Sequence, residues 1–282
     1  MSKNYFKRVV AGACLGAAAT AAPLSAHAVF DITITFSGNL SPSAQALFSA
    51  AESFWESVIT GYAPGVLLTG LTIDASGVPL DGFGNVLGSA GPSMLTFQGG
   101  YFLATAGLMQ FDTADIPTLI GNGSFGDVIR HEMGHVLGFG TLWTTNNVYV
   151  DFTGMYTGIN ALAAYQTEFN QPLATFVPVE LGGGSGTANG HWDEVNGGGS
   201  NTGIVDQQGR DKRFELMTGW LNSPSYVSVT TAASFQDIGY TVNISAVPEP
   251  AALMLLLAGI PAVAGLTARR RRRAGTVTST AA

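Results

Sequence analysis

The sequence predicts an α+β fold, with an N-terminal half built on a twisted mixed sheet and a C-terminal half of irregular loops. Two observations predict this class. Before residue 143 the patterns run in the order strand, helix, several strands and a second long helix. After that residue the composition shifts toward glycine, serine and asparagine, which favours loops over regular packed elements.

The first strand and helix are indicated by periodicity and by capping residues. Residues 30–36 alternate apolar and polar side chains, as a half-buried strand does. Ser41 suits the N-cap of a helix, and Pro42 suits its first position. The apolar face of this helix has helical spacing and indicates core packing: Leu47, Ala51, Phe54, Trp55 and Val58. Residues 67–73 are the second candidate strand.

The middle of the N-terminal half predicts loops followed by short strands. Glycine and small polar residues over 81–92 favour loops. Residues 94–97 and 101–105 suggest a hairpin or an edge strand, and 107–111 suggest a further short strand. Together with the first two strands, these segments would supply the sheet.

Three further helices follow from boundary signals and periodicity. The first has Ser124 as a candidate N-cap, Asp127 in its first turn, where the helix dipole favours an anion, and Gly138 beyond its end. A short helix is expected around residues 158–165, and a last one over 228–238.

The N-terminal residues 1–28 predict a signal peptide, and therefore export. A basic start leads into an apolar, alanine-rich run over 9–24. Ala26-His27-Ala28 then gives the small-x-small pattern of a cleavage site, which places the mature start near Val29. A structural first helix and a lipoprotein signal at Cys14 are the alternatives. A lipoprotein signal usually has a large aliphatic residue shortly before its cysteine. The three positions before Cys14 hold only alanine and glycine.

The C-terminal residues 245–282 form a tail of three ordered parts. Pro248-Glu249-Pro250 precedes an apolar run over 251–268, which is long enough to cross a bilayer. Arginines fill positions 269–273 and favour the cytoplasmic side. This order resembles the PEP-CTERM sorting signal of Gram-negative bacteria. The resemblance implies recognition by an exosortase, removal of the tail, and release or surface attachment of the body, while an ordinary membrane anchor is the alternative.

Between these ends lies an acidic body of about 220 residues, which we divide into an N-terminal part over 29–143 and a C-terminal part over 144–244. Its eighteen acidic residues outnumber its four basic ones: Arg130, Arg210, Lys212 and Arg213. Binding of nucleic acid is therefore disfavoured, because phosphates require a basic surface. The chain's one cysteine lies in the signal segment, so disulfide and thiol chemistry are not expected in the body.

The helix predicted to begin after Ser124 carries a metal-binding pattern. His131, Glu132 and His135 form an H-E-x-x-H arrangement. Residues four apart share one helix face, so both imidazoles can reach one metal ion. Glu132 is then placed to take a proton from a metal-bound water. A surface helix with two solvated histidines is the alternative.

A catalytic zinc site commonly has three protein ligands, and the third is not obvious here. The common extension of the motif requires a histidine where this chain has Thr141. His191 is the one other histidine of the mature body, and the glycine-rich loop over 181–203 could deliver it. Asp151 and Glu168 are carboxylate alternatives, although neutral imidazole is the preferred ligand.

At this point the chain resembles the leishmanolysin-like branch of the metzincin zinc peptidases. In that family a long insertion separates the histidine pair from a third histidine in a His-Trp context, as in His191-Trp192. A Glu-Leu-Met segment then forms a methionine turn, and Glu215-Leu216-Met217 matches it. The closing helix over 228–240, the approach over 111–115 and the run over 138–143 also look similar.

The resemblance covers roughly residues 107–242 and implies a two-part metzincin fold with the active cleft between the α/β part and the irregular part. It implies zinc held by three histidines, a general base and an apolar floor below the metal: His131, His135 and His191, then Glu132, then Met217. Some metzincins keep a tyrosine two residues after the methionine, where this chain has Gly219.

We therefore expect an exported zinc metalloendopeptidase that cleaves proteins or peptides outside the cytoplasm. It would be secreted or surface-attached in a Gram-negative bacterium, after transient anchoring of the tail in the inner membrane. The alternatives are a non-catalytic, zinc-stabilised surface or matrix protein and a zinc hydrolase of a non-peptide bond. A structural calcium ion in the acidic loops is a further hypothesis, although no D-x-D-x-D-G loop is present.

Overall fold

The computed structural model describes residues 30–194, 198 and 200–247. The predicted signal peptide and sorting tail, including the candidate membrane span, lie outside the described residues. Within the described part of the chain, every helix is too short or too polar to cross a membrane.

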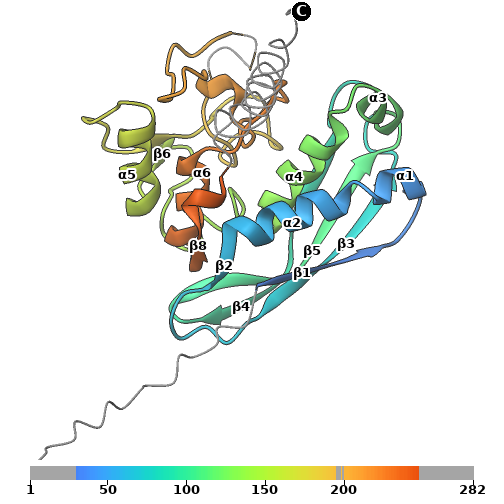
Figure 1. Ribbon diagram of the computed structural model, residues 1–282, viewed down its shortest axis with the longest axis horizontal. Helices are drawn as coiled ribbons and strands as arrows, with labels where there is room; N and C mark the ends of the chain where they lie inside the picture. Colours follow the sequence, from blue (N-terminus) through green and yellow to red (C-terminus); the bar gives the residue numbers. More distant parts are fainter. Residues whose placement is uncertain (1–29, 195–197, 199, 248–282) are drawn as a thin grey trace, which may run out of the picture.

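A four-stranded mixed sheet in the order β1-β3-β5-β4 forms the N-terminal half (Figure 1). β1 and β5 run parallel to β3, whereas β4 runs antiparallel to β5. The strands are β1 (Asp31–Phe36), β3 (Gly70–Val78), β4 (Gly88–Gln98) and β5 (Tyr101–Asp112). The α+β class is confirmed by this sheet and the helices that cover it.

The strand boundaries correct three predictions. The candidate strand over 67–73 becomes β3, which begins at Gly70 and continues to Val78. Residues 88–92 were expected in a loop, but they pair with β5 as the first part of β4. Residues 107–111 continue β5 rather than form a separate strand. The predicted strands over 67–73 and 107–111 are therefore confirmed with different bounds. The predicted loop over 88–92 was wrong, because backbone pairing with β5 outweighed the local glycine-rich composition.

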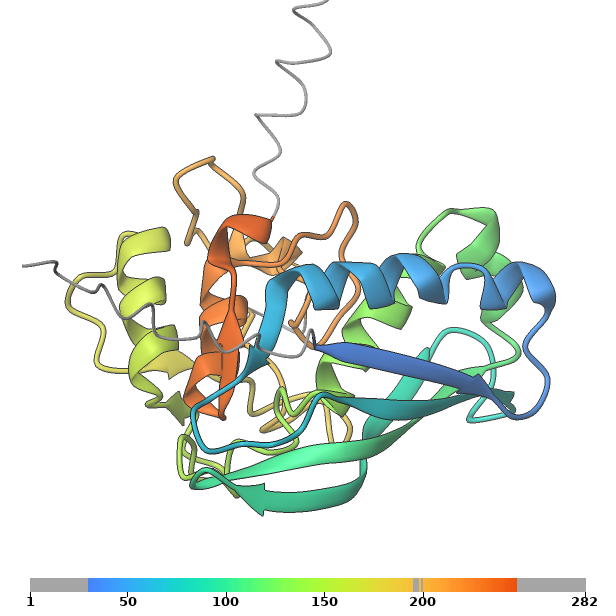
Figure 2. The ribbon, with the colours of Figure 1, turned by 60° about the horizontal axis from the view of Figure 1, so that its bottom comes forward.

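Two long helices, α2 (Phe48–Val58) and α4 (Phe125–Val136), lie on one face of the sheet (Figures 1 and 2). The helix expected from Ser41 is divided into α1 (Pro42–Gln45) and α2. The Ser41 hydroxyl accepts from the amide of Ala44, as the predicted N-cap should.

Helix α4 is fixed tightly against both the sheet and α2. Trp55 of α2 donates its indole N–H to the carbonyl of Arg130 at 2.9 Å. A Cβ on Gly107 of β5 would lie 2.1 Å from Val136, so the helix approaches the strand more closely there than any side chain would allow. The site-bearing helix therefore has a defined height above the sheet.

The start of α4 differs from the prediction. Ser124 has helical backbone angles and makes no capping hydrogen bond. Its hydroxyl instead donates to Asn122 at 2.6 Å, because α3 (Ile116–Gly121) leads into α4 through a tight turn. Asp127 lies in the first turn as expected, and it forms an ion pair with Arg130 at 3.4 Å.

The C-terminal half consists of short elements joined by long loops. Strand β2 (Ile59–Tyr62) of the N-terminal half pairs antiparallel with β8 (Tyr240–Val242) and thereby joins the two halves. The helix expected over 228–238 is α6, and the Ser228 hydroxyl caps its start by accepting from the amide of Thr231. The remaining elements are β6 (Met155–Tyr156), α5 (Ile159–Glu168), β7 (Val177–Pro178), η1 (Lys212–Phe214), α6 (Val229–Asp237) and η2 (Ile244–Ala246).

A buried aromatic cluster joins these two halves. The rings of Trp143 and Trp192 stack with centroids 4.9 Å apart, and Phe139 meets Trp192 edge-on at 5.0 Å. The indole N–H of Trp192 donates to Thr231 at 2.8 Å. The loop that carries His191 is therefore packed against the segment that follows α4.

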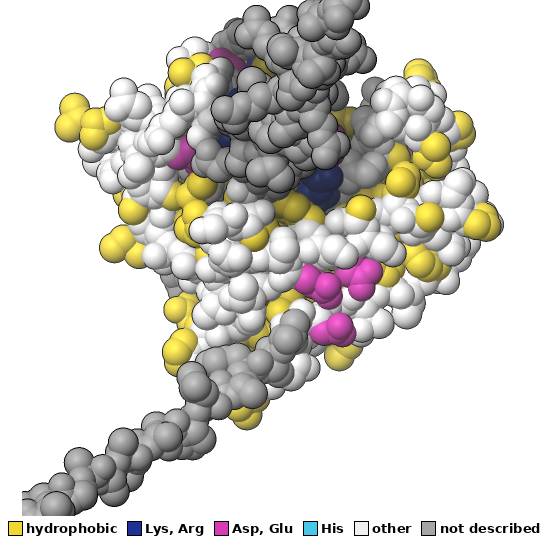
Figure 3. Space-filling model, in the orientation of Figure 1, with side chains coloured by type: hydrophobic (Ala, Val, Ile, Leu, Met, Phe, Trp, Pro, Cys, Tyr) yellow, Lys and Arg dark blue, Asp and Glu magenta, His cyan; other side chains and the backbone are white. Residues whose placement is uncertain are grey.

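The surface is consistent with the acidic composition of the body. Figure 3 shows a group of acidic side chains exposed on one face. Burial, together with the charges of Glu56 and Asp31, raises the pKa of Glu52 on α2.

Candidate metal centre

Helix α4 supplies the first two imidazoles from one face. His131 and His135 are one helical turn apart, and their Nε2 atoms lie 3.0 Å from each other. The helix ends immediately afterwards, since Gly138 has a φ of 113°, which a residue with a side chain rarely adopts. The chain then turns away from the helix axis, so another loop can approach the Nε2 atoms of His131 and His135.

His191 reaches the pair from 56 residues beyond His135. Its loop passes so close to the turn after α4 that a Cβ on Gly140 would lie 2.2 Å from the carbonyl oxygen of Gly190. On the other side, the amide of Trp192 donates to the carbonyl of Met217 at 3.0 Å. Close approach at glycine and pairing with the methionine turn together deliver the third imidazole.

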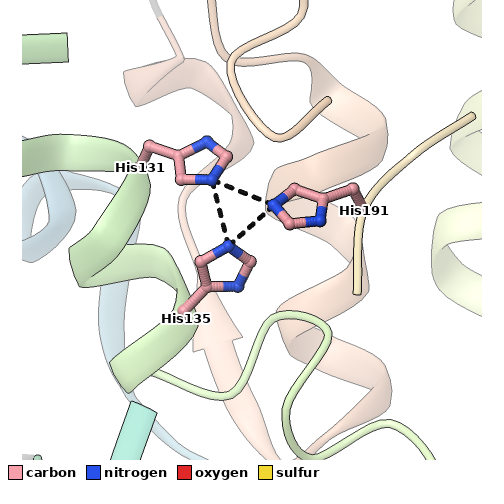
Figure 4. Close-up of side chains that lie close together, drawn as sticks. All are labelled: His131, His135 and His191. Atoms are coloured by element: carbon pink, nitrogen blue, oxygen red, sulfur yellow. Dashed lines mark hydrogen bonds between the residues drawn. The ribbon is translucent and has the colours of Figure 1, made fainter. Parts of the chain in front are cut away.

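The three Nε2 atoms form a nearly equilateral triangle with sides of 3.0, 3.0 and 3.1 Å (Figure 4). Each Nδ1 faces a backbone carbonyl instead: Leu216 at 2.7 Å for His131, Phe139 at 2.9 Å for His135 and Thr187 at 2.8 Å for His191. In each neutral ring the Nδ1 proton is therefore donated to a carbonyl, and the Nε2 lone pair is left at the centre.

Three converging lone pairs cannot hydrogen-bond to one another and would be stabilised by a cation. A tetrahedral zinc ion with Zn–N bonds of about 2.0–2.1 Å requires donor nitrogens about 3.3 Å apart, close to the sides of this triangle. The three histidines lie close enough to hold a metal ion.

Burial keeps the three imidazoles neutral. It lowers the pKa of His131, lowers that of His191 to about 3, and lowers that of His135 well below its usual range. Mutual repulsion of the charged forms acts in the same direction for His135 and His191. Metal ligation requires the neutral ring, so this environment favours binding of a cation over binding of protons.

Known proteins give no further guide to this centre. No model of a known protein family matches the chain, and no curated protein matches it.

Glu132 follows His131 on α4 and is only 6% exposed. Its Oε2 is buried without a hydrogen-bond partner. Burial raises the pKa of this carboxyl to about 8. A buried carboxyl with a raised pKa beside a metal site is typical of an acid–base group.

Met217 packs on α4 at Gly134, the residue before His135. A Cβ on Gly134 would lie 2.9 Å from the Cε of Met217 and 3.0 Å from its Sδ, so glycine is needed for this contact. The amide of Met217 donates to the carboxylate of Glu215 at 2.6 Å.

Glu215 has a bracing role that sequence reasoning missed. Its other oxygen accepts from the amide and hydroxyl of Ser228 at 2.9 and 3.0 Å and from the hydroxyl of Thr231 at 2.6 Å. The carboxylate thus ties the methionine turn to the start of α6. The sequence indicated Glu215 only as part of the Glu-Leu-Met segment. Its hydrogen bonds could not be predicted, because Ser228 and Thr231 are distant from it in sequence.

The other candidate ligands lie elsewhere. Asp151 is exposed and accepts from the Thr144 hydroxyl, while Glu168 accepts from the amides of Val229 and Thr230 at the start of α6. Thr141 donates its hydroxyl to the carbonyl of His135 at 2.7 Å. Within the described residues, the three histidines are the one group of metal-ligating side chains that converge, so the calcium hypothesis gains no site there.

Proposed function

We propose that this chain is an exported zinc metalloendopeptidase of the leishmanolysin-like metzincin type. The observation that supports it best is the triangle of three imidazole Nε2 atoms with the carboxylate of Glu132 on the same helix. A metal held only for structure would need no buried, unpartnered carboxylate beside it. Burial of an unpartnered carboxylate lowers the stability of the fold, and a role in catalysis would explain why the chain keeps it.

The chemistry divides between the metal and the carboxylate. When bound, zinc lowers the pKa of a coordinated water and polarises a carbonyl oxygen. Glu132 would accept a proton from the attacking water and return it to the leaving amine. Burial raises the pKa of Glu132 to about 8, and a nearby cation lowers it, so the carboxyl can exchange a proton near neutral pH.

The sheet supports a peptide as substrate. β4 is an edge strand, and its first residue, Gly88, lies against Glu132. In the described part of the chain no strand pairs with the outer edge of β4, so an extended peptide could add to the sheet there. Such pairing would bring a peptide bond past the carboxylate, which favours a peptidase over a hydrolase of other bonds.

Export and sorting rest on the sequence of the two ends. Residues 1–28 and 245–282 predict a signal peptide and an exosortase-recognised tail. We propose a mature body that acts on extracytoplasmic proteins.

The test compares purified wild type with Glu132→Ala on a denatured protein substrate, with and without a chelator. We expect wild type to cleave the substrate, chelation to abolish cleavage, and E132A to bind zinc with unchanged stoichiometry but to lose at least about 100-fold in kcat. Full activity of E132A would disprove the role of the carboxylate. A zinc-loaded wild type that cleaves no protein would favour the non-catalytic surface protein or a non-peptide hydrolase.

A further inference from the structure

The carboxylate of Glu132 is held by shape and not by hydrogen bonds. In the part of the chain that the structure describes, no residue donates a hydrogen bond to it, and Oε2 is fully enclosed. A side chain that ends in two unbonded oxygens keeps one rotamer only if its neighbours leave it one space. The residue that bounds this space is therefore important for the direction of the carboxylate.

Gly88, the first residue of β4, bounds that space. A Cβ on Gly88 would lie 2.9 Å from both Cγ and Oε1 of Glu132 and 3.0 Å from its Cδ. Gly88 is not among the glycines with positive φ, so its backbone conformation would accept any residue. Glycine at position 88 is therefore explained by the neighbouring carboxylate of Glu132 and not by the backbone conformation.

The loop before Gly88 is anchored by two buried aspartates, Asp112 at the end of β5 and Asp115 just after it. The carboxylate of Asp112 accepts from the amides of Asp81 and Gly82 at 2.9 and 2.8 Å. Asp115 accepts from the amide of Gly84 at 2.9 Å. The last loop residue is fixed as well, because the amide of Asp112 donates to the carbonyl of Leu87 at 3.1 Å. These hydrogen bonds therefore fix the position of the backbone where the loop leads into Gly88.

The same short segment also holds the helix that carries Glu132. Phe111, next to Asp112, packs edge-on against Phe125 in the first turn of α4, with ring centroids 5.2 Å apart. Residues 111–115 thus contact both sides of the space: the loop that delivers Gly88 and the helix that delivers Glu132. This arrangement gives a physical role to the Phe-Asp-Thr-Ala-Asp approach seen in the sequence.

We propose that Gly88 is a positioning residue for the Glu132 carboxylate, and that Asp112 and Asp115 hold Gly88 in place through the loop over 81–87. The inference rests on the proposed role of Glu132 as a general base. Its mechanism is steric: the absence of a side chain at position 88 leaves one position for the carboxylate.

Gly88→Ala tests the proposal, with Gly91→Ala on the same strand as the matched control. A Cβ on Gly91 would make only an ordinary contact, 3.7 Å from the Cγ2 of Thr141, and Gly91 also lacks a positive φ. For G88A we expect kcat to fall about 10- to 100-fold while KM and zinc affinity change less than about twofold. A crystal structure of G88A should show the Glu132 carboxylate displaced. In G91A the Glu132 carboxylate should keep its wild-type position, because a Cβ at residue 91 has no contact with Glu132.

Three results would overturn the proposal. They are an unchanged kcat in G88A, an equal displacement of the Glu132 carboxylate in a G91A crystal structure, and an undisplaced carboxylate in the G88A crystal structure. If wild type hydrolyses no peptide, the proposed function fails, and the crystal structure still decides the position of Glu132.

If G88A does not fold, Asp115→Ala provides a second test. It removes the acceptor of the Gly84 amide without adding atoms near Glu132. We expect a lower kcat with zinc affinity retained. An unchanged kcat in folded D115A would contradict the anchoring role.

Discussion

Each histidine of the centre has one nitrogen committed to a backbone carbonyl, so the state of the ring is set before any metal arrives. The cost of this arrangement is sensitivity to acid, because a proton on Nε2 would be buried among two other imidazoles. The pKa of His191 is lowered to about 3 in the folded protein, against about 6.5 in an unfolded chain.

This difference predicts that the metal-free protein loses stability as the pH falls below about 6.5. Between that pH and about 3, the unfolded chain binds a proton at residue 191 that the folded chain does not, so acid favours unfolding. Thermal melting of chelator-treated protein from pH 7.5 to 4 measures the effect. His191→Gln should show a shallower decline, and an identical slope in H191Q would contradict the prediction.

At this scale the sequence predicted the triangle well, for a simple reason. The helical repeat pairs His131 with His135, and residues 30–247 contain one other histidine. The N-cap at Ser124 was wrong, because the hydroxyl found a nearer partner in Asn122. Gly88 could not be predicted, since its importance depends on a contact with Glu132 across 44 positions of sequence.

Helix α4 is the element that both halves of the site share, and its two internal glycines differ sharply in surroundings. Gly134 faces the methionine turn, where a Cβ would lie 2.9 Å from Met217 and 3.3 Å from Trp55. Gly126 has nothing within 4 Å of such a Cβ. The same Gly→Ala change at these two positions of one helix therefore separates the effect of packing from the effect of helix propensity.

Gly134→Ala should lower the free energy of unfolding by about 1–3 kcal/mol, because the added methyl overpacks the contact with Met217. It should also weaken zinc binding, since the helix must move away from the turn. Gly126→Ala should instead raise the free energy of unfolding by up to about 1 kcal/mol. Denaturant unfolding and zinc titration measure both. A stabilised G134A would show that Met217 does not pack tightly there.

Element boundaries were predicted less well than element types. β4 begins within a stretch that composition assigns to a loop, because its glycines and proline pair with β5 despite low strand propensity. The helices α5 and α6 were found near their expected places, since local periodicity and the Ser228 cap determine them.

The three histidines come from two halves of the molecule, which also meet through the β2–β8 pairing and an aromatic cluster. The α+β class followed from the order of local patterns, but the joining of the halves did not. Trp192 and Glu215 act through partners distant in sequence, and local patterns contain no information on such contacts.

Removal of the metal should therefore loosen the molecule as well as stop hydrolysis. A ligand present at about 1,000 times its Kd stabilises the folded state by about 4 kcal/mol, so chelation should lower the melting temperature of wild type. His135→Ala should melt at the lower temperature with or without chelator. Calorimetry decides the matter, and a wild-type melting temperature unaffected by chelation would argue against a shared metal.

The 56-residue separation of His135 and His191 has a consequence for how the folded chain could be stabilised. A disulfide that closes a loop of this length would add about 4 kcal/mol, but the chain's single cysteine, Cys14, precedes the described body. A metal held at both positions would act as the missing cross-link, and unlike a disulfide it could be withdrawn. The supply of metal in the surroundings, and not their oxidising power, would then determine how firmly the loop is closed.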